Sequence, residues 1–415
     1  MSGKECFEIL DKIFLPKKME NIENIKGYTM KYGHIVENLK EYDGFEVPES
    51  AIVDEVLVSY FKEPMSYTTE NMCEINTHGG NIVVKKILEL CLKNGAEMAE
   101  PGEFTKRAFL NGRIDLLQAE SVIDIIDAKS ERELKAGMNQ LEGRVSKEIH
   151  DIKQKIMDVM VNVEVDIDYP EYDVEEVTNT EINEMLDVVI ADLSRLEKSF
   201  DNGKILKDGV KTAIIGKPNA GKSSLLNCIL NEERAIVTEI EGTTRDTIEE
   251  FVTVEGVPLK LIDTAGIREA KDEVEKIGIT KSKEIAKDAD LIIAIFDSSK
   301  DLTDEDKEIL DIIKNKTAIV VLNKMDLLNK IDENMAEIKN VSKYIVKMST
   351  LEQKGIDDLY KSIGNLFSME EISLDNTTVI TNVRHKNLIS KALNSCREAK
   401  KSMELGMPLD IIAIF

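Results

Sequence analysis

The stretch that decides the fold is VKTAIIGKPNAGKSSLLNCIL, residues 210–230. It reads as an apolar strand, a loop and a helix, and the loop at 216–223 fits the pattern GxxxxGK[ST] in full. Glycines in such a loop let the backbone wrap around phosphates, while successive N–H groups and the helix N-terminus supply positive potential. In this pattern Lys222 reaches the β- and γ-phosphates and the Ser223 hydroxyl ligates Mg²⁺. The stretch predicts a nucleotide-binding site. The alternative interpretation is a glycine-rich turn between a strand and a helix that binds no ligand.

Short β-rich runs separated by helical patterns surround this stretch on its C-terminal side. They are FVTVEGV, LKLIDT, LIIAIFD and AIVVLNK. Strands that alternate with helices are typical of a doubly wound, mostly parallel sheet. We therefore predict a P-loop α/β domain over residues 207–367.

Further polar motifs follow at the ends of these strands. Asp263-Thr264-Ala265-Gly266 ends one strand, where a carboxylate can hold Mg²⁺ through water and a glycine can sense the γ-phosphate. Asn323-Lys324-Met325-Asp326 ends another. The Asp326 carboxylate accepts from N1–H and the exocyclic amine of guanine, whereas adenine presents an acceptor at N1, so GTP is favoured over ATP. The GTTRD loop at 242–246 lies between the phosphate loop and Asp263, and its Thr244 could supply a second hydroxyl for Mg²⁺. Together the motifs predict phosphoryl transfer by positioning and electrostatics.

A water-orienting glutamine is missing from this set. The position after Gly266 holds Ile267, which cannot hydrogen-bond through its side chain. Another polar group must position the attacking water, or hydrolysis is very slow. The stretch that follows offers Asp272, Glu273 and Glu275, although on composition alone these carboxylates suit a solvated helix face.

The segments that flank the α/β domain differ from it in the spacing of their apolar residues. Residues 1–99 mix β-like runs with one amphipathic stretch, which predicts a small α+β domain. Residues 100–206 and 368–415 have helical spacing, so the α/β domain is expected to be inserted into a helical bundle. Apolar residues three or four apart predict one long helix over 134–163, a second over 182–200 and a third over 388–403. Their stripes are Leu134, Met138, Leu141, Val145, Ile149, Ile152, Ile156, Val159 and Val163; Ile182, Leu186, Val189, Leu193, Leu196 and Phe200; and Leu388, Ala392, Ser395, Ala399 and Met403.

Composition excludes several classes of protein. A net charge of −25 disfavours nonspecific coating of nucleic acid, because affinity for phosphate backbones comes from cations. The longest apolar runs fall far short of the ~20 residues of a membrane span. The N-terminus lacks the pattern of a signal peptide. The five cysteines are scattered without a CxxC pair, so we expect reduced thiols and a cytoplasmic protein.

Taken together, the sequence motifs resemble those of one family, MnmE (TrmE), the GTPase of wobble-uridine modification in tRNA. GKPNAGKSSLLN, AIVTEIEGTTRDTI and DTAGIREAKDEVEKIGI are similar to its G domain. AEPGEFTKRAFLNGRIDLLQAESVIDIIDA is similar to its junction between the N-terminal and helical domains and discriminates more strongly, because many GTPases share the first three blocks. The resemblance covers essentially the whole chain.

The resemblance implies a K⁺-dependent GTPase in which K⁺ replaces an arginine finger. Its K⁺ site would be Asn219, Thr238, Ile240 and Thr243, and Glu275 matches the catalytic glutamate that acts through a bridging water. Mg²⁺ would be held by Ser223 and Thr244. The nucleotide-binding residues implied by the motifs and the resemblance are Asn219, Ala220, Gly221, Lys222, Ser223, Ser224, Thr238, Glu239, Ile240, Glu241, Gly242, Thr243, Thr244, Asp263, Thr264, Ala265, Gly266, Asn323, Lys324, Asp326 and Ser349.

The resemblance also implies partners and a second ligand. The family dimerises through its N-terminal domain, and it works on tRNA together with the FAD protein MnmG. Its N-terminal domain binds a formyl- or methylene-tetrahydrofolate as one-carbon donor, and Glu74 and Arg113 match folate-contacting positions. Without the resemblance, Glu74 reads as a strand-face carboxylate and Arg113 as a surface residue. The domains implied are 1–99 for folate and dimerisation, 100–206 and 368–415 for the helices, and 207–367 for the G domain.

The sequence departs from the family pattern at several places. We expect the usual first strand, which ends in Arg-Ile-Ser-Gly, and the C-terminal Cys-x-Gly-Lys tail to be absent, and Ser349-Thr350-Leu351 is a weak match to the guanine-contacting Ser-Ala-Lys loop. Two alternatives therefore stay open. One is a ribosome-assembly GTPase of the Era or Der type, which predicts a basic RNA-binding domain. The other is a GTP-dependent interaction module with little turnover.

Overall fold

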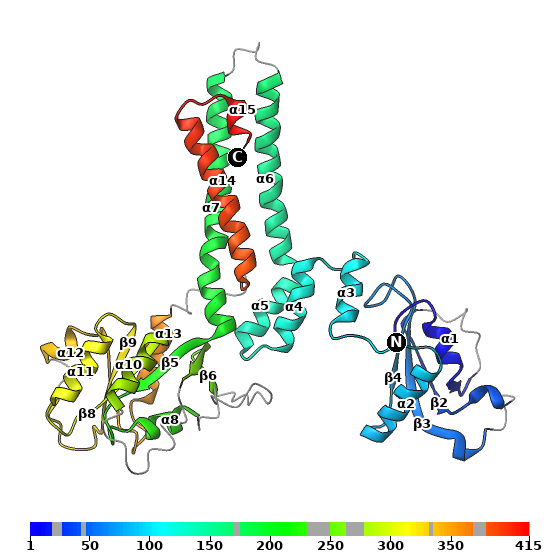
Figure 1. Ribbon diagram of the computed structural model, residues 1–415, viewed down its shortest axis with the longest axis horizontal. Helices are drawn as coiled ribbons and strands as arrows, with labels where there is room; N and C mark the ends of the chain where they lie inside the picture. Colours follow the sequence, from blue (N-terminus) through cyan, green and yellow to red (C-terminus); the bar gives the residue numbers. More distant parts are fainter. Residues whose placement is uncertain are drawn as a thin grey trace. The chain divides into compact units, whose positions relative to one another are not determined.

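The structure is a computed structural model that describes residues 1–18, 27–42, 47–168, 175–230, 250–262, 278–331, 335–367 and 379–414. It divides into two compact units, residues 1–123 and 124–415, which Figure 1 draws with their helices and strands. The observed architecture confirms the predicted fold class, an α+β N-terminal region, a helical region and an inserted P-loop α/β region. No helix among the described residues combines the length and the apolar character that crossing a membrane requires.

The first unit is built on a four-stranded antiparallel sheet with the order β1-β2-β3-β4. Alternate residues of β3, such as Val56 and Val58, face a core that also holds Leu10 and Cys73, as expected of a strand with one covered face. The elements are α1 (Cys6–Asp11), β1 (Phe14–Pro16), β2 (Thr29–Val36), the 3₁₀ helices η2 (Leu39–Glu41) and η3 (Glu49–Ala51), β3 (Ile52–Phe61), β4 (Met72–Asn76), α2 (Asn81–Lys93) and α3 (Glu103–Leu110). Helix α4 (Leu116–Ile126) crosses the boundary between the units.

The helical part of the second unit consists of α5 (Glu131–Leu141), α6 (Arg144–Asp168), α7 (Glu175–Asp208), α14 (Val383–Glu404) and α15 (Leu409–Ile412). Figure 1 shows α14 running beside α7, and the ion pair between Lys400 and Asp187 joins these two helices. The six residues of the stripe predicted over 182–200 are all buried in α7, which confirms that prediction. The C-terminal helix therefore packs against the earlier ones, as predicted.

Two details of the predicted helices are wrong. The stripe from Leu134 to Val163 belongs to two helices, because the chain turns at Gly143, whose φ of +81° an L side chain rarely adopts. The buried face of α14 follows the predicted stripe only in part. Ala399 is buried and Met403 packs against the core of α6 and α7, but Leu388 is 58% exposed, and Ile389 and Leu393 are buried instead.

The inserted part carries a six-stranded sheet with the order β10-β9-β8-β5-β7-β6, parallel except for β6. Helices cover both faces. The side chains of α8 and α13 pack on one face, and those of α10, α11 and α12 on the other. The elements are β5 (Val210–Ile215), α8 (Lys222–Leu230), β6 (Glu250–Val254), β7 (Val257–Leu261), α10 (Gly278–Asp288), β8 (Leu291–Asp297), α11 (Asp304–Ile313), β9 (Ala318–Asn323), α12 (Ala336–Lys339), β10 (Tyr344–Lys347) and α13 (Ile356–Leu366).

The two ends of the insertion lie close together. The chain enters the sheet directly after α7, since Asp208 ends the helix and Val210 begins β5. It returns at Ile380, whose backbone N–H donates to the Ser199 hydroxyl of α7 at 3.2 Å. An insertion whose ends meet on one helix leaves the surrounding helices free to pack as a bundle, which fits the predicted topology.

Candidate functional site

The candidate phosphate loop connects β5 to α8. Its backbone takes unusual conformations at Asn219, with φ of +62°, and at Gly221, with φ of +109°. A Cβ atom at Gly221 would lie 2.2 Å from Nδ2 of Asn323, so only glycine fits this approach. Helix α8 begins at Lys222, immediately after the loop. The loop backbone and the helix N-terminus therefore meet at one place, which is the arrangement that binds phosphate.

Lys222 lies folded back on the candidate phosphate loop. Its Nζ donates to the carbonyl oxygens of Gly216 at 2.7 Å and of Lys217 at 2.8 Å. Burial lowers the pKa of Lys222, because removal from water disfavours the charged ammonium. Anionic phosphate oxygens at this place would stabilise the ammonium more strongly than two neutral carbonyl oxygens.

Asn323, at the end of β9, ties this loop to a second one. The side chain is fully buried, and its Nδ2 donates to the carbonyl oxygen of Ala220 at 2.9 Å and to Oγ1 of Thr350 at 3.2 Å. Its Oδ1 accepts from the backbone N–H of Thr350 at 3.1 Å. Because β5 and β9 are parallel strands on either side of β8, their C-terminal ends open on the same edge of the sheet. Asn323 thereby joins the predicted phosphate loop to the predicted base-recognition loop.

Asp326 and Lys324 are each held by a side chain from another segment. Ser349, just beyond β10, donates its hydroxyl to Oδ1 of Asp326 at 2.6 Å and leaves the rest of this exposed carboxylate open to other donors. Lys324 has a φ of +65°, and its Nζ donates to Oδ2 of Asp297 at 2.6 Å. Burial raises the pKa of Asp297, but hydrogen bonds from Lys324 and Ser299 outweigh it and hold that pKa below the usual range.

The sequence pattern did not single out Asp297, and it named Thr350 only within the weak match Ser349-Thr350-Leu351. Thr350 bonds Asn323 through both its backbone and its hydroxyl, and Asp297 anchors Lys324. A carboxylate at the end of the apolar run LIIAIFD is a signal for Asp297 that the sequence does contain. The bond between Thr350 and Asn323 has no such signal, since it crosses 27 residues.

Many predicted site residues lie outside the described part of the chain. They are Thr238, Glu239, Ile240, Glu241, Gly242, Thr243, Thr244, Asp263, Thr264, Ala265, Gly266 and Glu275. Of the predicted Mg²⁺ ligands the structure places Ser223, one residue after Lys222 on α8, and of the K⁺ ligands it places Asn219. Both carry the oxygen donors that these hard cations prefer.

A separate cavity of about 610 Å³ lies in the first unit, between β4 and α2. Glu74 lines it, and so does Tyr67. The guanidinium carbon of Arg113 lies 4.5 Å from the centroid of the Tyr67 ring. Of the two predicted folate contacts, Glu74 thus lines the cavity, and Arg113 contacts Tyr67, which lines the same cavity.

The doubly wound sheet, with the predicted phosphate and base-recognition loops at one edge, has the architecture of a P-loop GTPase. Sequence profiles of known families extend this assignment to the rest of the chain. The profile of the MnmE helical domain matches residues 116–415, and that of the GTP-binding protein TrmE N-terminus matches residues 1–113. The chain belongs to the MnmE (TrmE) family.

Relatives match along the entire length of the chain. The tRNA modification GTPase MnmE of Thermoanaerobacter pseudethanolicus is 50% identical over 417 residues, which are 100% of this chain and 88% of the relative. The proteins of the same name from Clostridioides difficile and Bacillus subtilis are 47% and 44% identical over 416 residues, with the same shares of each chain. The resemblance stated from the sequence is thereby confirmed.

Proposed function

We propose that this chain is a GTPase that acts in the modification of the tRNA wobble uridine, where it serves to attach an aminomethyl-type group at C5. The observation that carries the proposal is the buried Asn323, which joins the predicted phosphate loop to the predicted base-recognition loop. The chain is also 50% identical to a tRNA modification GTPase. The guanine base would donate to Asp326, and Lys222 would turn from the loop carbonyls toward the β- and γ-phosphates.

The proposed hydrolysis depends on charge stabilisation without a glutamine or an arginine finger. Water attacks the γ-phosphorus, the bond to the β,γ-bridging oxygen breaks, and GDP and phosphate leave. Ser223 and Thr244 would hold Mg²⁺, and Asn219, Thr238, Ile240 and Thr243 would hold K⁺; both cations offset the negative charge of the phosphates. Glu275 would orient the attacking water through a second water and take up its proton.

The test of this proposal is GTP hydrolysis in buffers that contain either K⁺ or Na⁺, with ATP as the competing nucleotide. We expect hydrolysis in K⁺ to be at least about tenfold faster than in Na⁺, because lowering the activation free energy by about 1.4 kcal/mol raises the rate tenfold. Glu275→Gln should abolish most of this rate and leave GTP affinity intact, while Glu305→Gln, on the exposed face of α11, should change neither. Equal rates in the two salts contradict the K⁺ proposal. Equal, slow rates for the wild type and Glu275→Gln favour an interaction module.

The same chain is proposed to bind a one-carbon donor. The cavity in the first unit has room for a tetrahydrofolate derivative, and Glu74 can accept hydrogen bonds from the amino groups of a pterin ring. Arg113 would hold Tyr67 as an aromatic wall. Calorimetry with 5-formyltetrahydrofolate tests this proposal: Glu74→Gln should weaken binding, and unchanged affinity would contradict the assignment.

The proposed partners are a second copy of the chain, bound through the N-terminal domain, the FAD protein MnmG, and tRNA. The net charge of −25 means that tRNA contact must rely on local basic patches, so we expect affinity to fall steeply with salt. A cytoplasmic setting follows from these partners. The decisive assay combines the chain, MnmG, GTP, methylene-tetrahydrofolate and unmodified tRNA, and detects the modified uridine by mass spectrometry. No modified uridine in the presence of GTP hydrolysis would favour a ribosome-assembly GTPase instead.

A further inference from the structure

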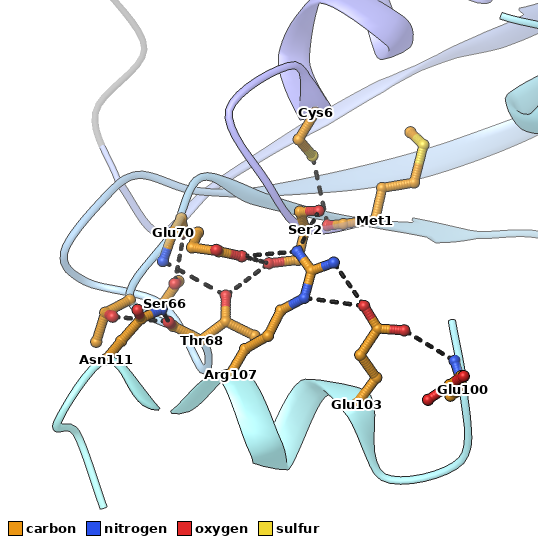
Figure 2. A network of polar contacts seen from close by, with 11 residues as sticks. Met1, Ser2, Cys6, Ser66, Thr68, Glu70, Glu100, Glu103, Arg107 and Asn111 are labelled. Carbon is orange, nitrogen blue, oxygen red and sulfur yellow. Dashed lines mark hydrogen bonds and ion pairs between the residues drawn. The ribbon is translucent and has the colours of Figure 1, made fainter. Parts of the chain in front are cut away.

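Arg107 of α3 lies between two carboxylates in the first unit (Figure 2). Its Nε and Nη2 donate to Oε1 of Glu103 at 3.1 and 2.6 Å, and its Nη1 donates to Oε2 of Glu70 at 3.1 Å. Hydrogen bonds from Arg107 to Glu103 and then to Glu70 raise the pKa of the guanidinium. A planar guanidinium with several donors can hold both carboxylates at once, which a lysine ammonium does less well.

Glu70 also contacts the N-terminal residues, and further hydrogen bonds connect these residues and α3 to Thr68, as Figure 2 shows. The same Oε2 accepts from the Ser2 hydroxyl at 2.9 Å, and Ser2 Oγ lies 2.6 Å from Oγ1 of Thr68. Asn111, directly after α3, donates to the carbonyl oxygen of Thr68 at 2.7 Å. Arg107 thus joins α3, the N-terminal residues and residues 66–70, which we call the 66–70 loop.

Tyr67 is the large side chain of the 66–70 loop and is held from two sides. Its hydroxyl lies 3.0 Å from Oγ1 of Thr105, and Arg113 stacks on its ring. The loop is also closed on itself, because the Ser66 hydroxyl donates to the carbonyl oxygen of Glu70 at 2.6 Å. The position of the Tyr67 ring therefore depends on Ser66 and Glu70, the two residues that begin and end this short loop.

Each segment that Arg107 joins supplies a side chain to the wall of the 610 Å³ cavity. Met1 precedes Ser2, Tyr67 lies in the 66–70 loop, and Phe104 follows Glu103, and all three line the cavity with Glu74. Arg107 does not line this cavity itself, but it does line a neighbouring one of about 330 Å³. Arg107 therefore contacts the segments that carry Tyr67 and Phe104 without lining the 610 Å³ cavity itself.

We propose that Arg107 is a positioning residue of the ligand cavity, which fixes the Tyr67 ring against the bound one-carbon donor by anchoring the 66–70 loop through Glu70. This inference rests on the proposed function of the cavity. Half-exposed ion pairs add little to the stability of a protein, so the main effect of Arg107 falls on ligand affinity.

The test is the affinity of the full chain for 5-formyltetrahydrofolate, measured by calorimetry. Arg107→Ala should weaken binding about tenfold, because small displacements of a contact are costly, and Arg107→Lys should lie in between. Lys106→Ala, which removes the neighbouring exposed cation of the same helix, should stay within about twofold of the wild type. GTP hydrolysis by all three variants should match that of the wild type.

A double-mutant cycle separates positioning from a general structural effect. If Arg107 acts through Tyr67, then Arg107→Ala should cost less than about twofold in a Tyr67→Ala background, because the ring it positions is gone. If the affinity loss of the double variant equals the product of the losses of the two single variants, the proposal is overturned. It is also overturned if Arg107→Ala binds with the affinity of the wild type.

Hydrogen exchange distinguishes failure of this inference from failure of the proposed function. If the wild type binds no tetrahydrofolate derivative, the one-carbon role fails, and exchange in the peptide 62–72 then decides whether Arg107 anchors the loop. We expect about tenfold faster exchange there in Arg107→Ala and no change in α2. Exchange equal to that of the wild type in this peptide would overturn the inference.

Discussion

Asn323 is the side chain that ties together two described segments of the candidate nucleotide site. Asn323→Ala leaves the carbonyl oxygen of Ala220 and the backbone N–H of Thr350 without their partner. Unpaired buried groups cost about 1–3 kcal/mol, so we expect GDP affinity to fall about 10- to 100-fold. Calorimetric titration with GDP measures this fall. Asn315→Ala, at an exposed position after α11, is the control and should bind as the wild type does; equal affinity of Asn323→Ala would contradict the role given to Asn323.

We expect Glu133 to make the stability of the second unit depend on pH. Its backbone N–H donates to Ser130, and its Oε2 accepts from the backbone N–H of Lys129 at 2.7 Å, so the two residues cap α5. Burial raises the pKa of Glu133 from 4.5 to about 6. The pKa of Glu133 is higher in the folded protein than in the unfolded chain, so ionisation of this carboxyl disfavours the folded state. The free energy of unfolding is therefore highest below pH 4.5 and falls as the pH rises through 6.

Glu133→Gln should therefore stabilise the protein above pH 7 and give no advantage below pH 4.5. Glutamine keeps the acceptor for Lys129 and carries no charge, so the gain at high pH is about 1 kcal/mol, after a discount for partial solvent screening. Urea unfolding across this pH range is the measurement, and the exposed Glu131→Gln on the same helix is its control. A gain that is independent of pH would show that the raised pKa is not the cause.

The β6–β7 hairpin contacts the segment that leads into α5. Lys129 Nζ lies 3.6 Å from the centroid of the Phe251 ring, while Lys260 Nζ lies 5.7 Å from the same centroid. In the sequence this hairpin lies between the predicted loops that contain Thr244 and Asp263. A change in either loop thus has a short covalent path to the hairpin, and the hairpin touches the segment before α5 through the contact of Phe251 with Lys129.

A coupling energy between Lys129 and Phe251 would measure how firmly the hairpin is attached. In a double-mutant cycle of Lys129→Met and Phe251→Leu, urea unfolding should show a coupling of about 1 kcal/mol, typical of a partly desolvated cation over a ring. The cycle of Lys260→Met with Phe251→Leu should give about a third of that value or less. Equal coupling in the two cycles would contradict the importance of the short contact.

Elements with a strong internal signal could be predicted from the sequence, and those defined by distant partners could not. The strands around the phosphate loop are apolar runs of strand length, and α7 buries the whole stripe that its spacing indicates. Strand β10 is only four residues long, and its pairing with β9 is what defines it. The buried face of α14 likewise depends on α7, which no local pattern reports.

The candidate site divides in the same way. Lys222 and Asp326 carry a fixed spacing within one segment, so the motif finds them. Thr350, Asp297 and Arg107 act through contacts that cross 27 to 37 residues, and only the folded chain brings them to their partners. Sequence motifs therefore identify the groups that touch the ligand more readily than the groups that hold them.

For the whole molecule, the central claim is that the phosphate loop, the segment 323–326 and the segment 349–350, at one edge of the inserted sheet, select guanine and make the chain a GTPase. The most direct measurement compares the wild type and Asp326→Asn with GTP and with xanthosine triphosphate in K⁺ buffer. The carboxamide donates where the carboxylate accepts, and xanthine carries a carbonyl in place of the exocyclic amine. We predict that the variant loses about 100-fold in kcat/KM for GTP and prefers xanthosine triphosphate. An Asp326→Asn variant that still hydrolyses GTP like the wild type would contradict the account.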